Sequence, residues 1–250
     1  MTDWNQRYAT KDYFYGTEPN DFVVETATRI PPGPVLCLAE GEGRNAVYLA
    51  RRGHAVTAVD AAETGLAKAH ALAASRAVSL TTAVADLAHY RIEPGAWAGI
   101  VSTWVHLPPP LRRRVHAQVV AGLRPGGVFV LEAYTPAQLA FGTGGPKDVN
   151  LLMTLPAVRD ELSGLELVIA RECEREVHEG SGHNGRSAVV QVLAIRPPSD
   201  RLARRQRCAT PRTGGRVFNG RSAADAHLID RARQRIVHQR PECRRIDRGN

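Results

Sequence analysis

The stretch "VLCLAEGEGRNAVYLA", residues 35–50, decides the fold, because an apolar run passes into two glycines one residue apart and then into a helical pattern. A strand that turns on glycines into a helix presents backbone N–H groups to a bound nucleotide. Gly41, Gly43 and Ala46 also satisfy the G-x-G-x-x-G/A spacing of dinucleotide-binding enzymes. The turn therefore predicts a nucleotide site and leaves the identity of the nucleotide open.

Outward from this stretch, apolar β-branched segments alternate with helical patterns, which predicts a parallel sheet with helices on both faces. The last two apolar segments are joined by the glycine-rich "HEGSGHNGR", residues 178–186, and predict an antiparallel hairpin. We therefore expect an α/β fold with a doubly wound, mostly parallel seven-stranded sheet ending in that hairpin. The expected strands are 35–39, 55–59, 78–84, 98–103, 127–133, 165–177 and 187–195, and the expected helices are 44–52, 64–75, 110–122 and 155–162.

The net charge of +8 is not spread over the chain. Residues 198–250 contain 14 Arg, no Lys and 5 acidic residues, a balance of +9, which leaves −1 for residues 1–197. We expect an N-terminal cap or lid over 1–34, a nucleotide-binding domain over 35–197, and an Arg-rich, weakly ordered tail over 198–250. Since the body is nearly neutral, we expect no nucleic-acid partner beyond non-specific contacts of the tail.

The cysteine and histidine content indicates the cellular compartment and whether a metal site is expected. The four cysteines are scattered and form no C-x-x-C pair, which argues against a cysteine zinc site and favours a reducing compartment. No apolar run approaches the roughly 18 residues of a membrane span, and we see no secretory signal. His178 and His183 flank the expected hairpin turn, and two histidines without a third ligand indicate turn residues rather than a metal site. We expect a cytoplasmic protein without a metal.

In doubly wound sheets, ligands bind at the carboxyl ends of the strands, where the strand order reverses. Asp60 ends the second expected strand, where a carboxylate can hold ribose hydroxyls. The other strand ends carry small, polar or acidic residues that suit the same ligand. The candidate cofactor-binding residues are Glu40, Gly41, Gly43, Asp60, Ala61, Asp86, Leu87, Ser102 and Thr103.

Five features stand in register along the chain: "AEGEGRN" (39–45), Asp60, "ADL" (85–87), "LRPGG" (123–127) and the final hairpin. With these features the chain resembles class I S-adenosylmethionine-dependent methyltransferases, and in particular the small-molecule branch that includes tellurite-resistance and thiol methyltransferases. The resemblance covers roughly residues 4–197, because the N-terminal "WNQRY" and "YFYGTEPNDF" are similar to the cap segment of that branch. It implies S-adenosylmethionine as cosubstrate, bound by the candidate residues above.

The chain departs from the common family pattern in its first strand. Cys37 stands where many members have an Asp, and the acidic residue falls at Glu40. The resemblance carries the role of that acid, binding of the cosubstrate's amino group, to Glu40. We expect Cys37 to pack as a small buried hydrophobe.

The residues after the fourth strand bear on the methyl acceptor. "STWVHLPPP" lacks the Asn/Asp-Pro-Pro-aromatic signature of nucleic-acid amino methyltransferases, so we expect a small-molecule acceptor, with a thiol or chalcogen anion as the candidate. His106 is the candidate catalytic base or orienting donor, the alternative being a cap of the following helix. Trp104, Tyr134 and Tyr15 are the candidate substrate or lid residues, with core packing as their alternative.

Two other functions stay open from the sequence. The fold can bind S-adenosylmethionine as a non-catalytic module. The glycine turn with Asp60 also permits an NAD-dependent oxidoreductase, although the chain has no Tyr-x-x-x-Lys pair and closes on a hairpin rather than on a sixth parallel strand.

Overall fold

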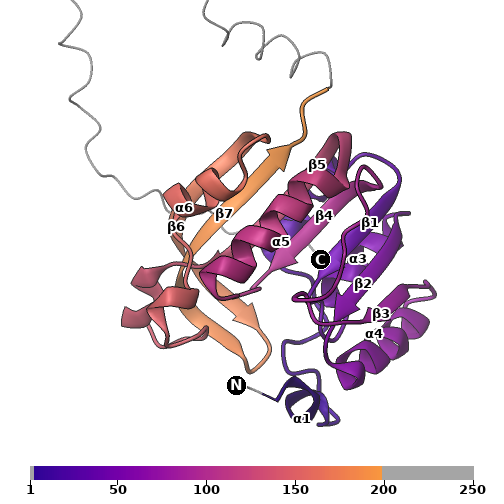
Figure 1. Ribbon diagram of the computed structural model, residues 1–250. Coiled ribbons are helices and arrows are strands. Elements are labelled where there is room, and N and C mark those ends of the chain that lie inside the picture. Colours follow the sequence, from indigo (N-terminus) through magenta and orange to yellow (C-terminus); the bar gives the residue numbers. More distant parts are fainter. Residues whose placement is uncertain (1–2, 199–250) are drawn as a thin grey trace, which may run out of the picture.

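A seven-stranded sheet in the order β3-β2-β1-β4-β5-β7-β6 forms the centre of the computed structural model, which describes residues 3–198 (Figure 1). Apart from Pro198, the predicted tail lies outside these residues. Within the sheet β7 runs antiparallel to both of its neighbours, and the other pairings are parallel. This confirms the predicted doubly wound sheet with a final hairpin. The strands are β1 Pro34–Leu38, β2 Ala55–Asp60, β3 Thr81–Val84, β4 Trp97–Thr103, β5 Leu123–Tyr134, β6 Glu166–Glu179 and β7 His183–Ile195.

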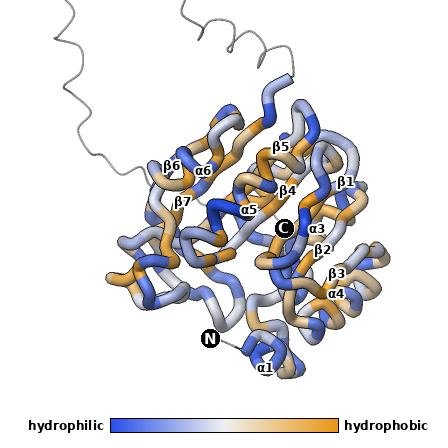
Figure 2. The backbone as a smooth tube through the Cα atoms, in the orientation of Figure 1, coloured by the Kyte–Doolittle hydropathy of each residue, from blue (hydrophilic) through white to orange (hydrophobic). Residues whose placement is uncertain are grey.

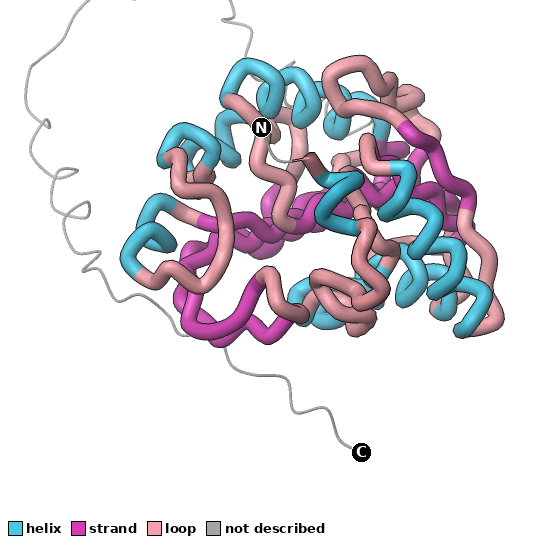
Figure 3. The backbone as a smooth tube through the Cα atoms, turned by 90° about the horizontal axis from the view of Figure 1, so that it is seen from below, coloured by secondary structure: helices cyan, strands magenta, loops and turns pink. Residues whose placement is uncertain are grey.

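Helices cover both faces of the sheet (Figure 3). Alternate side chains of β1 separate the two layers: Val35 and Cys37 pack on the side of α2, α3 and α4, while Leu36 and Leu38 pack on the side of α5 and α6. Cys37 is fully buried, as expected. Hydrophobic residues accordingly concentrate along the central strands (Figure 2). The helices are α1 Trp4–Tyr8, α2 Asp21–Thr26, α3 Arg44–Arg51, α4 Glu63–Ser75, α5 Pro109–Gly122 and α6 Leu155–Glu161, with 3-10 turns at Ala27–Arg29, Pro136–Ala140 and Val149–Leu151.

The glycine turn between β1 and α3 needs its glycines for packing. Gly41 and Gly43 have φ of +63° and +89°, a region that residues with a Cβ rarely adopt. A Cβ on Gly43 would collide with Ala69 of α4, so the glycine also permits close approach of the two helices. None of the helices in residues 3–198 is long and apolar enough to cross a membrane.

The hairpin is longer than the sequence predicts. Pairing of β6 with β7 continues to Glu179 and His183, so the turn shrinks to residues 180–182. The N-terminal segment stabilises this turn, because Ser181 N and Gly182 N both donate to the carbonyl oxygen of Phe14. The prediction that His178 and His183 are turn residues is therefore wrong: His178 lies in β6, and His183 is the first residue of β7 and is only 4% exposed.

Candidate functional site

The strand order reverses between β1 and β4, so the carboxyl ends of these strands form the topological switch point of the sheet. Asp60, at the end of β2, is fixed beside the glycine turn. Its Oδ2 accepts a hydrogen bond from Gly41 N at 2.8 Å and its Oδ1 accepts one from Ala62 N at 2.7 Å. Burial raises the pKa of Asp60, although these N–H donors oppose the shift. The carboxylate is thus oriented by backbone N–H groups of the two loops.

Glu40 lies on the other side of the same turn. Its Oε1 accepts hydrogen bonds from Asn45 N at 2.9 Å and Ala46 N at 2.7 Å, so it caps the first turn of α3. Burial raises the pKa of Glu40 to about 7. A cationic group placed against this carboxyl would favour its ionised form.

The remaining predicted cofactor residues lie at the end of β4 or just after β2 and β3. Thr103 accepts a hydrogen bond from Asn45 Nδ2 at 2.9 Å, and Ser102 is buried beside it. Asp86 is exposed and accepts from Ala88 N at 2.7 Å, which stabilises the turn after β3. Leu87 is buried in the core on the α5 face. Ala61 is exposed directly after Asp60.

The N-terminal segment covers the glycine turn. A Cβ on Gly41 would lie 2.6 Å from the hydroxyl oxygen of Tyr8, so α1 sits directly on this turn. Glu42 anchors the segment, because its Oε2 accepts from Phe14 N at 2.8 Å and from Tyr15 N at 3.3 Å. The other oxygen of Glu42 pairs with Lys68 of α4. The predicted cap is thus tied to the same loop that precedes α3.

Four rings meet beyond β4 and β5. Trp104 lies 4.4 Å from Tyr134 and 4.8 Å from His183, and Tyr15 lies 4.6 Å from His183, measured between ring centroids. The three predicted substrate or lid residues therefore come together around a histidine that was not predicted. Trp104 has φ of +60°, which is strained for a bulky residue and is typical of functional positions. We call these four residues, Tyr15, Trp104, Tyr134 and His183, the aromatic cluster.

Glu179 contacts two members of the aromatic cluster, Trp104 and His183. Its Oε2 accepts from Trp104 Nε1 at 2.6 Å and from Arg44 Nη2 at 2.6 Å, and lies 3.3 Å from His183 Nδ1. Burial would raise the pKa of Glu179, but the charge of Arg44 and these hydrogen bonds hold it well below its usual value. Burial lowers the pKa of His183, which favours a neutral ring.

Glu179 belongs to a larger buried charge network. The side chain of Asn20 donates both to Glu132 and to Glu179. Arg175 binds Glu132 through Nε at 2.9 Å and Nη2 at 2.8 Å. Glu132 is completely buried and also accepts from Gln191. The network joins the N-terminal segment, α3, β5 and the hairpin in a single set of contacts, which sequence reasoning missed.

His106 does not fit the expected role of proton acceptor in this arrangement. Its Nδ1 donates to the carbonyl oxygen of Trp104 at 3.0 Å, and its Nε2 accepts from Tyr134 N at 3.1 Å. Burial lowers the pKa of His106 to about 3. Because the backbone occupies both ring nitrogens, His106 links the end of β4 to the end of β5.

Part of the chain matches a known protein family and a curated relative. The family described as a methyltransferase domain matches residues 35–127. The 2-heptyl-1-hydroxyquinolin-4(1H)-one methyltransferase of Mycobacteroides abscessus is 32% identical over 121 residues, which is 47% of this chain and 53% of the relative. The chain therefore spans about half the length of this curated relative.

Solved structures share the fold over most of the described chain. TehB from Haemophilus influenzae aligns with a TM-score of 0.59 and 22% identity, covering 77% of this chain and 65% of TehB. The N-methyltransferase NodS from Bradyrhizobium japonicum, in complex with S-adenosyl-L-homocysteine, aligns with a TM-score of 0.57 and 17% identity, covering 79% of this chain and all of NodS. At this identity the likeness concerns the fold. Together with the family match, it confirms the predicted resemblance to class I S-adenosylmethionine-dependent methyltransferases.

Proposed function

We propose that this chain, which carries a methyltransferase domain at residues 35–127 and the class I methyltransferase fold, transfers a methyl group from S-adenosylmethionine to a small-molecule acceptor. One observation carries the proposal: the carboxylate of Asp60, fixed beside the glycine turn, and a cluster of four rings lie at the same edge of the sheet, at the ends of β2, β4 and β5. Such an edge can hold a nucleoside at one side and an acceptor at the other.

The chemistry of the donor set fits this cosubstrate. Asp60 would hold the ribose hydroxyls and Glu40 the amino group, while Ala61, Asp86, Leu87, Ser102 and Thr103 would line the rest of the site. S-adenosylmethionine supplies a methyl group on a cationic sulfonium, and aromatic faces attract cations. Trp104 is half-buried and offers such a face, while the fully buried Tyr134 packs against it. The ionised Glu179, which accepts from Trp104 Nε1, adds a negative charge. Asp60 and Glu40 therefore bind and orient, and the aromatic cluster surrounds the reacting centre.

Methyl transfer is an in-line displacement, so orientation and exclusion of water can supply most of the catalysis. The cap formed by α1 and Tyr15 would exclude water from the site. A thiolate or another chalcogen anion is already a nucleophile and needs no base. This class of acceptor suits a site in which His106 has no free nitrogen, and it is our preferred acceptor.

An aromatic hydroxyl is the second candidate acceptor, because the site is walled by rings and because the Mycobacteroides relative is named for a hydroxyquinolone. Such an acceptor must lose a proton. His183, neutral and hydrogen-bonded to Glu179, would be the group that takes it. His106 then acts as a positioning residue for Trp104 and Tyr134. We further propose that the reaction takes place in the cytoplasm.

Incubation of the protein with S-adenosylmethionine labelled on its methyl group tests the proposal. The acceptor panel contains small thiols, selenide, and hydroxylated quinolones, and calorimetry measures binding of S-adenosylhomocysteine and of NAD. We expect label transfer to at least one acceptor class and no NAD binding. Binding of S-adenosylhomocysteine without transfer to any acceptor would favour the non-catalytic module, and NAD binding alone would favour the oxidoreductase.

A further inference from the structure

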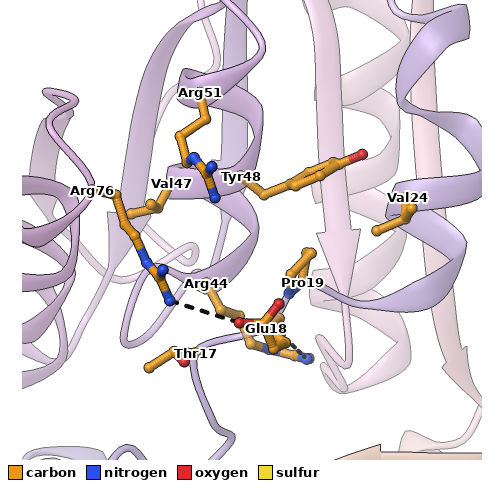
Figure 4. Close-up of a pocket in the computed structure, with 9 residues that line it drawn as sticks. All are labelled: Thr17, Glu18, Pro19, Val24, Arg44, Val47, Tyr48, Arg51 and Arg76. Carbon is orange, nitrogen blue, oxygen red and sulfur yellow. Dashed lines mark hydrogen bonds and ion pairs between the residues drawn. The ribbon is translucent and has the colours of Figure 1, made fainter. Parts of the chain in front are cut away.

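One face of α3 lines a recess. Arg44, Val47, Tyr48 and Arg51 follow one another at the i, i+3, i+4 and i+7 positions that share a helix face. The recess has a volume of about 230 Å³ and opens between this face, residues 17–19, α2 and the end of α4 (Figure 4).

Three guanidinium groups line this recess, against a single lining carboxylate. Arg44 is neutralised from within by Glu179, and it also donates to the carbonyl oxygen of Glu18 at 3.3 Å. Arg76 lies 3.7 Å from the Glu18 carboxylate, and these side chains are 43% and 66% exposed, so the pair is weak. Arg51 has neither a hydrogen bond nor an ion pair within the described part of the chain, and Figure 4 shows its guanidinium directed into the recess. The recess therefore carries excess positive charge.

The rest of the lining is apolar and aromatic. Val47 is buried, Val24 of α2 is half-buried, and the ring of Tyr48 extends along the side of the recess (Figure 4). A volume of about 230 Å³ suits a ligand smaller than a drug-sized molecule. Guanidinium groups next to a ring and valine side chains match a small aromatic anion.

The recess shares Arg44 with the network around Glu179, but its other end, at Arg51, lies away from the strand-end site. In a βα unit the helix runs back from the carboxyl end of its strand, so the end of α3 points toward the opposite edge of the sheet. Arg51 lies seven residues after Arg44, a displacement of about 10 Å along the helix at 1.5 Å per residue. A ligand held by Arg51 and Arg76 would therefore not occupy the aromatic cluster.

We propose that this recess binds a small aromatic oxyanion, with its carboxylate or phosphate paired to Arg51 and Arg76 and its ring against Tyr48 and Val24. Guanidinium groups bind both oxyanions through paired N–H donors. Glu18 occupies the position beside Arg76 and competes with the ligand. The proposal does not depend on methyl transfer.

Titration of the full chain at constant ionic strength tests this site, with phenyl phosphate, benzoate, inorganic phosphate and phenol as probes. Binding is followed by calorimetry and by backbone amide shifts in ¹⁵N-labelled protein. Arg51→Gln and Arg76→Gln are compared with Arg113→Gln, an exposed arginine on α5 that controls for non-specific attraction to arginines elsewhere. Thermal unfolding of each variant checks that it folds.

We expect phenyl phosphate or benzoate to bind more tightly than inorganic phosphate and phenol, with shifts around Tyr48 and Arg51. Arg51→Gln and Arg76→Gln should each weaken binding by about fivefold or more, as expected for the loss of a partly exposed charge-assisted contact. Arg113→Gln should have no effect. Glu18→Gln should strengthen binding about twofold or more, since it removes the competing charge. Equal binding by all four variants, or no saturable binding of any anion, would overturn the proposal, and the better of the two aromatic probes identifies the preferred headgroup.

Discussion

The edge of the sheet at the carboxyl ends of the parallel strands has two halves that are built in different ways: the glycine-turn half around Asp60 and Glu40, and the hairpin half around Glu179 and Glu132. In the glycine-turn half, the carboxylates of Asp60 and Glu40 accept hydrogen bonds from backbone N–H groups of nearby turns. In the hairpin half, Glu179 and Glu132 accept from side chains contributed by distant segments, among them those of Asn20 and Arg44. Backbone donors remain in place when one carboxylate is removed, whereas a buried ion pair leaves its partner uncompensated. The glycine-turn half should therefore lose ligand affinity on mutation, and the hairpin half should lose stability.

Removal of Glu179 is the largest test of this difference. Glu179→Ala leaves Arg44 buried without its carboxylate, and we expect the free energy of unfolding to fall by about 3–5 kcal/mol in urea titrations. Glu179→Gln keeps an oxygen for Trp104 Nε1 and should lose less. Glu93→Gln, an exposed glutamate, is the matched control and should change little.

The affinity of Glu179→Gln for S-adenosylhomocysteine tests whether the hairpin half contributes to cosubstrate binding. If folded Glu179→Gln lost as much affinity for S-adenosylhomocysteine as an Asp60 variant does, the division between the halves would be wrong.

The same contrast explains what sequence reasoning found. Asp60, Glu40 and the glycine turn could be predicted as site residues from the sequence, because each lies at the end of an apolar run and acts through the local backbone. The meeting of Tyr15, Trp104 and Tyr134 followed from strand ends and a resemblance. The network around Glu179 could not be predicted, because it requires the register of β6 against β7 and contacts across as many as 159 residues.

One signal for the hairpin half was present in the sequence and was not used. A three-residue Gly-Ser-Gly loop at 180–182 is a common hairpin connection, and it places Glu179 opposite His183. Because the sequence-based strands end at residue 177 and begin again at residue 187, the pairing of Glu179 with His183 was not predicted. The role of His106 could not be seen either, since its two partners are backbone groups of Trp104 and Tyr134.

The two histidines give the next test, on turnover rather than on stability. With a hydroxylated quinolone as acceptor, His183→Gln should lower turnover by about 10²-fold, the lower limit for loss of a general base. With a thiolate acceptor the loss should be much smaller. His106→Gln should affect both acceptors equally, because it removes a link between backbone groups.

A pH titration tests the role of His106 directly. Burial lowers the pKa of His106 to about 3, so its ring proton resonances should not move between pH 5 and pH 8, with added imidazole as the internal standard. Movement of the His106 resonances in this range, or an equal loss of both activities in His183→Gln, would reverse the assignment of roles.

Asp60 tests the glycine-turn half. Asp60→Ala should weaken binding of S-adenosylhomocysteine by about 1.5–3 kcal/mol, the range for hydrogen bonds to a charged group. The measurement is calorimetry, with the exposed Asp160→Asn as control. Asp60→Asn keeps an acceptor for Gly41 N and separates loss of charge from loss of the turn. Unchanged affinity in both variants would remove the end of β2 from the site.

Glu40 makes the stability of the same half depend on pH. Its pKa is raised from 4.5 to about 7, so the native state binds a proton more readily than the unfolded chain does. The resulting stabilisation is full below pH 4.5 and is lost as the pH rises through about 7. The partial exposure of Glu40 reduces the expected contribution to about 2 kcal/mol.

Glu40→Gln removes this titration and keeps an oxygen for Asn45 N and Ala46 N. Between pH 5 and pH 8, the unmodified chain should therefore lose about 2 kcal/mol of unfolding free energy relative to Glu40→Gln. Glu93→Gln should follow the unmodified chain. Parallel curves for all three proteins would mean that Glu40 is ionised throughout.

Truncation after Pro198 should have the smallest effect, because the residues assigned to both halves of the edge all precede Pro198. β7 ends at Ile195 between β5 and β6, and Arg196 closes the sheet through backbone hydrogen bonds with Gly126 and Gly127. The sequence of residues 198–250 offers few apolar side chains, while ordering them would cost about 1–2 kcal/mol per residue in backbone entropy. We expect the shortened chain to keep its affinity for S-adenosylhomocysteine and its Tm to within a few degrees. It should lose any salt-sensitive binding to nucleic acid, since the 14 arginines supply that attraction. A large fall in Tm or the loss of methyl transfer would show that the predicted tail completes one of the two halves, and a loss confined to one of them would identify which.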